Sequence, residues 1–279
     1  MRTANFKSAA IAALLSMGLL TGCTNGITNQ KTSNHMDTLN LTQEWDKKFP
    51  QSNKVNHRKV TFKNRYGITL AADLYEPKNI ESKVPAIAVS GPFGAVKEQS
   101  SGLYAQTMAE RGFLTLAFDP SYTGESGGEP RNVASPDINT EDFSAAVDFL
   151  IAHPNVDAKR IGIIGICGFG GMGLNAAAMD TRIKATVAST MYDMSRVNAN
   201  GYFDAEDSAE VRRNKREAMN AIRTRDAQNG TATPGTPGLP TSIKGDEPQF
   251  VKDYFDYYKT ERAFHARAIN SNGAWNPTM

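Results

Sequence analysis

The segment from Ile161 to Gly171 constrains the fold more than any other part of the chain. It reads IGIIGICGFGG, an apolar run followed by a corner at Cys167 and a glycine-rich stretch. The run 161–166 has the length and branched residues of a buried parallel strand, and residues 168–179 have the composition of a closely packed helix. A cysteine at such a helix N-terminus lies where partial positive charge favours a thiolate. The pattern predicts a strand–turn–helix unit that presents a nucleophilic sulfur.

The chain around this unit alternates between short apolar runs and helical stretches. Residues 58–63 and 69–75 alternate in polarity around a turn, which predicts a β-hairpin. Further buried strands are expected at 86–89, 113–118 and 183–188, with helices at 98–111, from Thr140 onward, and at 168–179. Strand and helix alternate from 84 to 188, which predicts a mostly parallel sheet with helices on both faces.

The character of the chain changes after Asp193. A charged helix is expected at 205–228, a loop at 229–240 and an aromatic-rich helix at 249–268. We predict a cap-like helical insertion over 194–279 that follows an α/β core over 57–193. The aromatic helix serves either simple packing or the lining of a substrate pocket, and the sequence leaves both open.

The N-terminus predicts secretion. Arg2 and Lys7 precede an apolar run at 9–20 that is too short to span a membrane. The following Leu20-Thr21-Gly22-Cys23 resembles the lipobox of bacterial lipoproteins. The resemblance implies removal of signal peptide 1–22, acylation of Cys23, and a lipid anchor in the cell envelope, on the outer membrane or periplasmic face if the cell has one. Residues 23–56 are then a polar tether ending in an adapter with Trp45 and Phe49.

Charge and composition exclude several classes of function. Lysine and arginine total 31 and aspartate and glutamate 29, and without Arg2 and Lys7 the two signs balance at 29 each. With no basic cluster, nucleic acid is not an expected partner. The four histidines are scattered and no HExxH occurs, so no metal is predicted. Residues 165–170 lack the register of a dinucleotide loop, and no cofactor is expected.

The corner at Cys167 resembles the nucleophile elbow of α/β-hydrolases, in the dienelactone-hydrolase-like branch where cysteine replaces serine. The resemblance runs from about Lys59 to Asp193, and its motifs lie at 73–77, 91–98 and 119–126. It implies an α/β-hydrolase fold and acyl transfer from a small-molecule ester, lactone or thioester to Cys167. It also implies an oxyanion hole formed by the Gly168 amide and an amide of the 91–94 loop. Pro92 has no N–H, so Phe93 is the expected donor and Gly94 the alternative.

Two features depart from the family pattern, and a third imitates it. Phe169 stands where the family has a small residue, and the glycine pattern after Cys167 is one residue longer. Residues 124–128 match G-x-S-x-G around Ser126, but no strand leads into them and no apolar helix follows. We therefore reject Ser126 as the nucleophile.

The base and acid of the family are hard to place in this chain. Only His265 follows Cys167, inside a helical pattern where packing is the competing interpretation, and Asp193 is a possible acid. The family carries both residues on later strands, so we expect a C-terminally truncated homologue with impaired activity. The strand at 183–188 would then present an open edge that allows self-association. The alternative is a non-catalytic lipoprotein, either a truncated remnant or a ligand-binding surface module.

Overall fold

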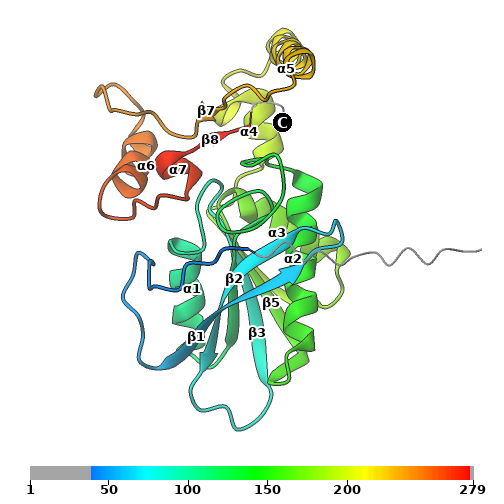
Figure 1. Cartoon of the computed structure of the whole chain (residues 1–279), viewed down its shortest axis with the longest axis vertical. Helices are drawn as coiled ribbons and strands as arrows, with labels where there is room; N and C mark the ends of the chain where they lie inside the picture. The colour runs from blue at the N-terminus through cyan, green and yellow to red at the C-terminus, as the bar shows by residue number, and fades with distance from the viewer. Residues whose placement is uncertain (1–38, 277–279) are drawn as a thin grey trace, which may run out of the picture. The chain divides into compact units, whose positions relative to one another are not determined.

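The computed structural model describes residues 39–276, so the predicted signal peptide and Cys23 lie outside the described residues. A six-stranded sheet has the order β1-β2-β4-β3-β5-β6 (Figure 1). Its strands are β1 (Val55–Lys63), β2 (Thr69–Pro77), β3 (Val84–Ser90), β4 (Leu114–Phe118), β5 (Val156–Ile166) and β6 (Ile183–Ser189). The β1–β2 hairpin is antiparallel and β2 is antiparallel to β4, whereas the remaining pairs are parallel. The predicted α/β-hydrolase fold is confirmed.

Helices cover both faces of this sheet. They are α1 (Ser100–Ala109), α2 (Pro136–Ala152) and α3 (Gly168–Met179). Alternation along β5 directs Ile161 and Ile163 into one apolar cluster and Ile164 and Ile166 into another. The first cluster includes side chains of α2 and α3, and the second includes side chains of α1. The sheet therefore separates two hydrophobic cores.

The predicted adapter packs against the second of these cores. Phe49 is buried there, and the Trp45 ring meets it edge-on at 5.7 Å between centroids. The indole N–H of Trp45 donates to the Phe49 carbonyl at 2.9 Å, and the Lys48 amide donates to the Glu98 carbonyl at 2.8 Å. The described end of the tether is thus fixed to the segment that follows β3.

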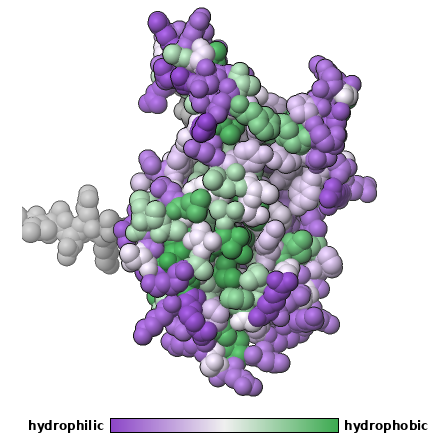
Figure 2. Space-filling model, turned by 180° about the vertical axis from the view of Figure 1, so that it is seen from behind, coloured by the Kyte–Doolittle hydropathy of each residue, from purple (hydrophilic) through white to green (hydrophobic). Residues whose placement is uncertain are grey.

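A mainly helical cap follows β6 and lies beyond the carboxyl ends of the parallel strands (Figure 1). It contains α4 (Met194–Asn200), a 3₁₀ turn (Tyr202–Asp204), α5 (Ala209–Asn229), β7 (Thr236–Pro237), α6 (Gln249–Lys259), α7 (Ile269–Asn272) and β8 (Ala274–Trp275). Neither α4 nor α5 buries a residue fully. In Figure 2, which views the molecule from behind, the upper end that carries α5 is coated with hydrophilic residues. No helix within residues 39–276 combines the length and apolarity needed to cross a bilayer.

Helix boundaries account for most of the differences from the sequence prediction. Helix α2 begins four residues before Thr140, because Ser135 caps it and Pro136 fits its first turn. Helix α6 ends at Lys259 instead of 268, so His265 does not lie in a helix. The short α4 was not predicted. The exact boundaries between tether, core and cap remain predictions.

Strand β6 lies at one end of the described sheet. Within the described residues β6 pairs only with β5, and Val187 on it is 52% exposed. The nearby side chain of Met179, at the end of α3, is 67% exposed. An edge strand with apolar side chains in solvent is a surface that can pair with another strand.

Candidate active site

Cys167 occupies a strained corner between β5 and α3. Its backbone has φ 56° and ψ −125°, a region that residues with a Cβ rarely adopt. Three backbone hydrogen bonds hold it there: its amide donates to Ser189, and its carbonyl accepts from Gly170 and Tyr192. Strain retained by surrounding contacts is a common property of functional positions. The corner predicted from the sequence is therefore formed.

Close backbone contacts explain how Phe169 fits a position where the family has a small residue. Its side chain is buried and packs near Phe143, with 6.3 Å between ring centroids. A Cβ at Gly91 would lie 2.8 Å from the Phe169 Cβ, and a Cβ at Gly165 would lie 2.2 Å from the Phe169 carbonyl oxygen. Because Gly91, in the loop after β3, has no side chain, it leaves room for Phe169 at this position.

The backbone N–H groups of Gly168 and Phe93 lie near the Cys167 thiol and favour its ionised form. They belong to the residues that the resemblance implied as oxyanion donors, and that role remains a prediction. Burial raises the pKa of the Cys167 thiol above its ordinary value, and the two N–H donors oppose that shift without cancelling it. The expectation that the helix N-terminus would leave this cysteine with a lowered pKa is wrong in direction.

A pocket of about 900 Å³ opens beside Cys167. One wall comes from the carboxyl ends of the strands and includes Phe93 and Ile166, and the other comes from the cap. The cap wall carries five tyrosines: Tyr192, Tyr202, Tyr254, Tyr257 and Tyr258. Three of these belong to α6, so the aromatic helix lines the pocket beside the cysteine. Trp275 stacks on Phe93 with 4.2 Å between ring centroids.

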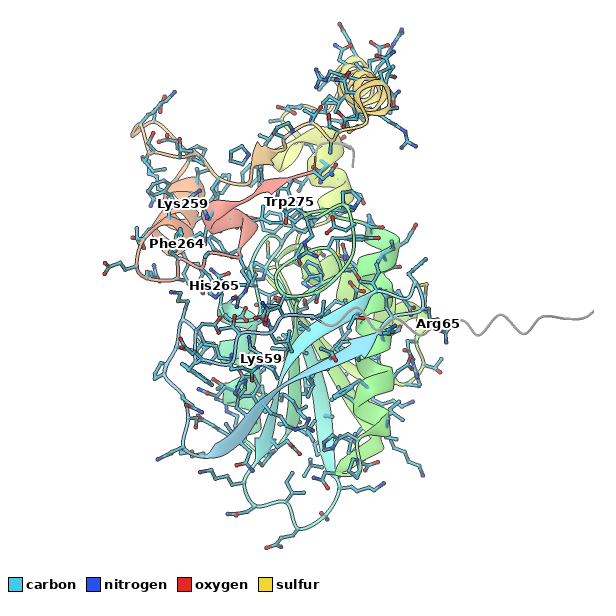
Figure 3. All side chains as sticks on the ribbon, in the orientation of Figure 1. Lys59, Arg65, Lys259, Phe264, His265 and Trp275 are labelled. Carbon is cyan, nitrogen blue, oxygen red and sulfur yellow. The ribbon has the colours of Figure 1, made fainter. Side chains whose placement is uncertain are left out.

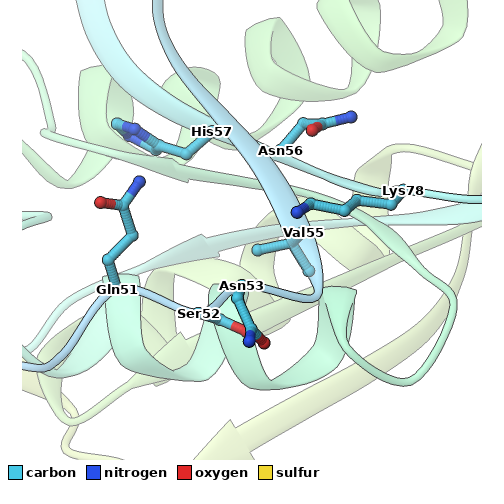
Figure 4. A pocket seen from close by; sticks show the side chains of 7 residues that line it. All are labelled: Gln51, Ser52, Asn53, Val55, Asn56, His57 and Lys78. Atoms are coloured by element: carbon cyan, nitrogen blue, oxygen red, sulfur yellow. The ribbon is translucent and has the colours of Figure 1, made fainter.

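No lining residue of this pocket, within residues 39–276, is an aspartate, glutamate, histidine, lysine or arginine. A second pocket of about 450 Å³ lies at the start of β1 and is lined by residues 51–53, residues 55–57 and Lys78 (Figure 4). It contains no cysteine, and its histidine, His57, is paired with Asp73 at 2.7 Å and not with Ser52. The chemistry-bearing pocket is therefore the one at Cys167.

The candidate base lies elsewhere in the structure. His265 is buried, and its Nε2 lies 3.6 Å from the Asp46 carboxylate. Burial lowers the pKa of His265, which favours the neutral ring. In Figure 3, the His265 label lies below that of Trp275 and above that of Lys59 on the sheet. None of the contacts of His265 in the described chain involves Cys167.

The candidate acid and the other described histidines also have different roles. Asp193 is exposed and caps α4 by accepting a hydrogen bond from the Arg196 amide at 3.0 Å. His57 pairs with Asp73, and His153 lies 3.5 Å from Glu76. Across residues 39–276, the structure therefore brings Cys167, Gly168 and Phe93 together, whereas the side-chain hydrogen bonds and ion pairs of Asp193 and His265 go to other residues.

We did not predict the buried ionic cluster that forms around Lys97, in the segment between β3 and α1. The Lys97 ammonium is fully buried and donates to Glu98 at 2.6 Å, Asp119 at 2.9 Å and Glu125 at 2.7 Å. Lys59 and Arg267 also contact its carboxylates. Residues 97, 98, 119 and 125 all lie in the motifs that carry the family resemblance. The charged residues in the loops that follow β3 and β4 were a signal in the sequence that could have suggested this cluster.

Three carboxylates of this region, those of Asp46, Glu98 and Glu125, lie within 4.8 Å of one another. The cations Lys59, Lys97 and Arg267 already lie against them, so the arrangement is that of a neutralised salt-bridge network. Ser126 is buried nearby, where its hydroxyl donates to the Asp119 carbonyl at 2.6 Å and accepts from the Ala71 amide at 2.8 Å. These contacts give Ser126 a structural role.

Comparison with known proteins identifies the family. A sequence model of the X-Pro dipeptidyl-peptidase (S15) family matches residues 66–274. The chain belongs to this family. The uncharacterized protein PA2218 of Pseudomonas aeruginosa is 59% identical over 283 residues, covering 99% of this chain and 76% of that protein. Its crystal structure matches with a TM-score of 0.82 and 64% identity, covering 86% of this chain and 74% of that one.

Two further relatives of this S15-family chain have names that state an activity or a fold. The thiohydrolase aneE of Aspergillus aculeatus is 33% identical over 132 residues, covering 47% of this chain and 41% of that protein. The α/β-hydrolase GrgF of Penicillium matches in structure with a TM-score of 0.59 and 22% identity, covering 80% of this chain and 74% of that one, and shows the fold alone. The family membership and the thiohydrolase relative support a hydrolase-like activity.

Proposed function

We propose that this chain is a membrane-tethered α/β-hydrolase that transfers acyl groups from esters, lactones or thioesters to Cys167. The observation that carries the proposal is the placement of two backbone N–H groups, those of Phe93 and Gly168, near the Cys167 thiol, which lines a large pocket. Donors positioned before the reaction are the usual means of stabilising an oxyanion in acyl transfer.

In the proposed first step the Cys167 thiolate attacks the substrate carbonyl carbon and forms a carbon–sulfur bond. The carbonyl oxygen becomes an oxyanion that accepts from the amides of Gly168 and Phe93. The bond to the leaving group then breaks, and the leaving group departs with its electron pair and takes a proton from water. In the second step water attacks the thioester, which releases the acid and regenerates the thiol.

We propose that turnover in this chain is slow. The raised pKa of Cys167 reduces the thiolate fraction at neutral pH, and no acid or histidine among the described lining residues can activate water. General acid–base help is worth roughly 10²–10⁴-fold. Thioesters fit this arrangement best, because a thiolate leaves with less need of a proton donor than an alkoxide. The relative named thiohydrolase supports the same choice.

The second candidate function is non-catalytic ligand binding by a lipoprotein. The same uncharged lining favours it, because a pocket without acid or base can bind a ligand and leave it unchanged. A time course with p-nitrophenyl acetate and butyrate separates the two. We expect a fast release of about one nitrophenolate per chain followed by slow turnover, and neither phase in Cys167→Ala. Identical traces from both proteins would contradict acyl transfer and leave ligand binding.

The membrane tether rests on the lipobox ending at Cys23. We expect labelled palmitate to be incorporated into the protein in a bacterial host and to be lost in Cys23→Ala. Cys167→Ala serves as the matched control because it removes the only other cysteine. Equal labelling of Cys23→Ala and the parent chain would contradict the tether without affecting the proposed chemistry.

A further inference from the structure

The described walls of the pocket at Cys167 carry no formal charge. Its lining in the described chain is made of apolar, aromatic and amide or hydroxyl side chains. Specific recognition of a charged ligand in a buried site requires a paired charge or a dense set of hydrogen bonds, since an unpaired buried charge is costly. The described walls offer no charged partner.

The tyrosine hydroxyls do not supply the missing charge. Burial raises the pKa of Tyr202, Tyr254 and Tyr258, so these side chains stay neutral at physiological pH. The Tyr254 hydroxyl lies 3.4 Å from that of Tyr192, and the Asn270 side chain lies near Tyr258. The Tyr192 and Tyr254 hydroxyls are thus close enough to pair with each other, and the aromatic rings form much of the wall that a ligand would contact.

The volume and the aromatic lining indicate what fills the space. About 900 Å³ is at the upper end of the range of small-molecule pockets, which are mostly apolar with few polar groups. Acetyl or propionyl groups would leave most of this volume empty. A longer chain would contact the rings of the cap wall while its carbonyl lay at Cys167.

We propose that the pocket binds an uncharged, apolar acyl chain of medium length and discriminates against acyl groups that end in a charge. The proposal specifies the substrate class of the acyl transfer proposed above and rests on it. It also implies that peptides with a free N-terminal ammonium are poor substrates, because none of the described lining residues is a carboxylate that could pair with that ammonium.

The test compares matched esters on the full chain carrying Cys23→Ala, in which Cys167 is the remaining cysteine. p-Nitrophenyl hexanoate and the p-nitrophenyl monoester of adipic acid have equal length and differ in a terminal carboxylate. After normalisation to their reaction with free N-acetylcysteine, we expect the hexanoate to acylate Cys167 at least about 100-fold faster, because the adipate brings a carboxylate against apolar and aromatic walls that offer it no charged partner. Equal normalised rates would overturn the proposal.

A binding measurement separates this proposal from the chemistry. In the full chain carrying Cys23→Ala and Cys167→Ala, 2-octanone and 7-oxooctanoate are titrated by calorimetry. We expect 2-octanone to bind and 7-oxooctanoate to bind at least about 100-fold more weakly. If neither ester acylates the protein but this difference appears, the acyl transfer is wrong and the ligand class stands. Equal binding of the two ligands, or no binding of 2-octanone, overturns the ligand class.

A charge-introducing variant gives a further check. Leu103 lines the pocket from α1 and is 45% exposed, so a lysine at this position can be accommodated. We expect Leu103→Lys to shift the normalised rate ratio at least about tenfold toward the adipate, because the ammonium supplies a partner for the carboxylate. Tyr66→Lys is the control, since Tyr66 is 59% exposed and lies outside the pocket lining. The same shift in both variants would overturn the proposal.

Discussion

The side-chain amide of Asn270 donates a hydrogen bond of 2.8 Å to the carbonyl oxygen of Phe93. The Asn270 backbone amide also donates to the Gly94 carbonyl at 3.0 Å. Phe93 is one of the two residues whose N–H groups lie near the Cys167 thiol and favour its ionised form. A residue near the end of the described chain therefore orients the loop after β3 that supplies one of the two proposed oxyanion donors.

Replacing Asn270 should slow acylation of Cys167 without making the thiol less reactive in general. We expect Asn270→Ala to lower the acylation rate about tenfold, less than the roughly 10²–10³-fold loss seen when an oxyanion donor itself is removed. Alkylation by iodoacetamide forms no oxyanion, so its rate should be nearly unchanged. Asn272→Ala, at an exposed position two residues later, is the control. A parallel loss in both reactions would show that Asn270 has only a structural effect.

The pH dependence of alkylation tests the environment of the thiol. Burial raises the pKa of Cys167, so the thiolate should form only above the pH range of an ordinary cysteine, whose pKa is about 8.5. We expect the iodoacetamide rate of the Cys23→Ala chain to rise with a midpoint above that of free N-acetylcysteine. A midpoint below that of the reference would mean that the N-terminus of α3 outweighs burial.

The Lys97 cluster should contribute strongly to stability. Lys97→Met leaves three buried carboxylates without their shared ammonium, and removing one partner of a buried ion pair costs about 3–5 kcal/mol. We expect this decrease in the free energy of unfolding by urea. Lys48→Met, at an exposed neighbouring lysine, should change it by less than about 0.5 kcal/mol. Equal stability of the two variants would show that the cluster contributes little.

The exposed edge of β6 should promote self-association. We propose that two copies pair through β6, where Val187 is exposed and one side of the strand has no partner within residues 39–276. A charge on the edge should prevent this, so Val187→Lys is expected to lower the average mass by sedimentation relative to the parent chain. Tyr66→Lys adds the same charge at a similarly exposed site on the β1–β2 turn and should have no effect. Unchanged association in Val187→Lys would contradict the proposal.

Local signals explain which parts of the fold could be predicted from the sequence. The range of α3, Gly168–Met179, was predicted in full because a strand, a tight turn and a glycine-rich helix leave a pattern within one short segment. The positions of Phe93 and Gly168 followed from the family resemblance at that corner. The β1–β2 hairpin was also predictable, since alternating polarity and a turn are both local.

Long-range contacts explain what the sequence left out. The helical pattern at 249–268 stops at Lys259, and the following segment turns so that Arg267 can reach Asp46 and Glu98, 221 and 169 residues earlier. The Lys97 cluster likewise joins residues that are distant in the chain. The place of His265 depends on the same turn, and therefore neither its burial nor its separation from Cys167 could be derived from helical periodicity.

The central claim is that Cys167 accepts an acyl group, and intact-protein mass spectrometry tests it most directly. The full chain carrying Cys23→Ala is mixed with p-nitrophenyl butyrate. Samples are quenched in acid at intervals, and the mass of the intact protein is measured. The account predicts one butyryl group per chain, located on the peptide that contains Cys167 and absent when Cys167→Ala is added. A chain that gains no mass, or gains the same mass in the Cys167→Ala variant, would contradict it.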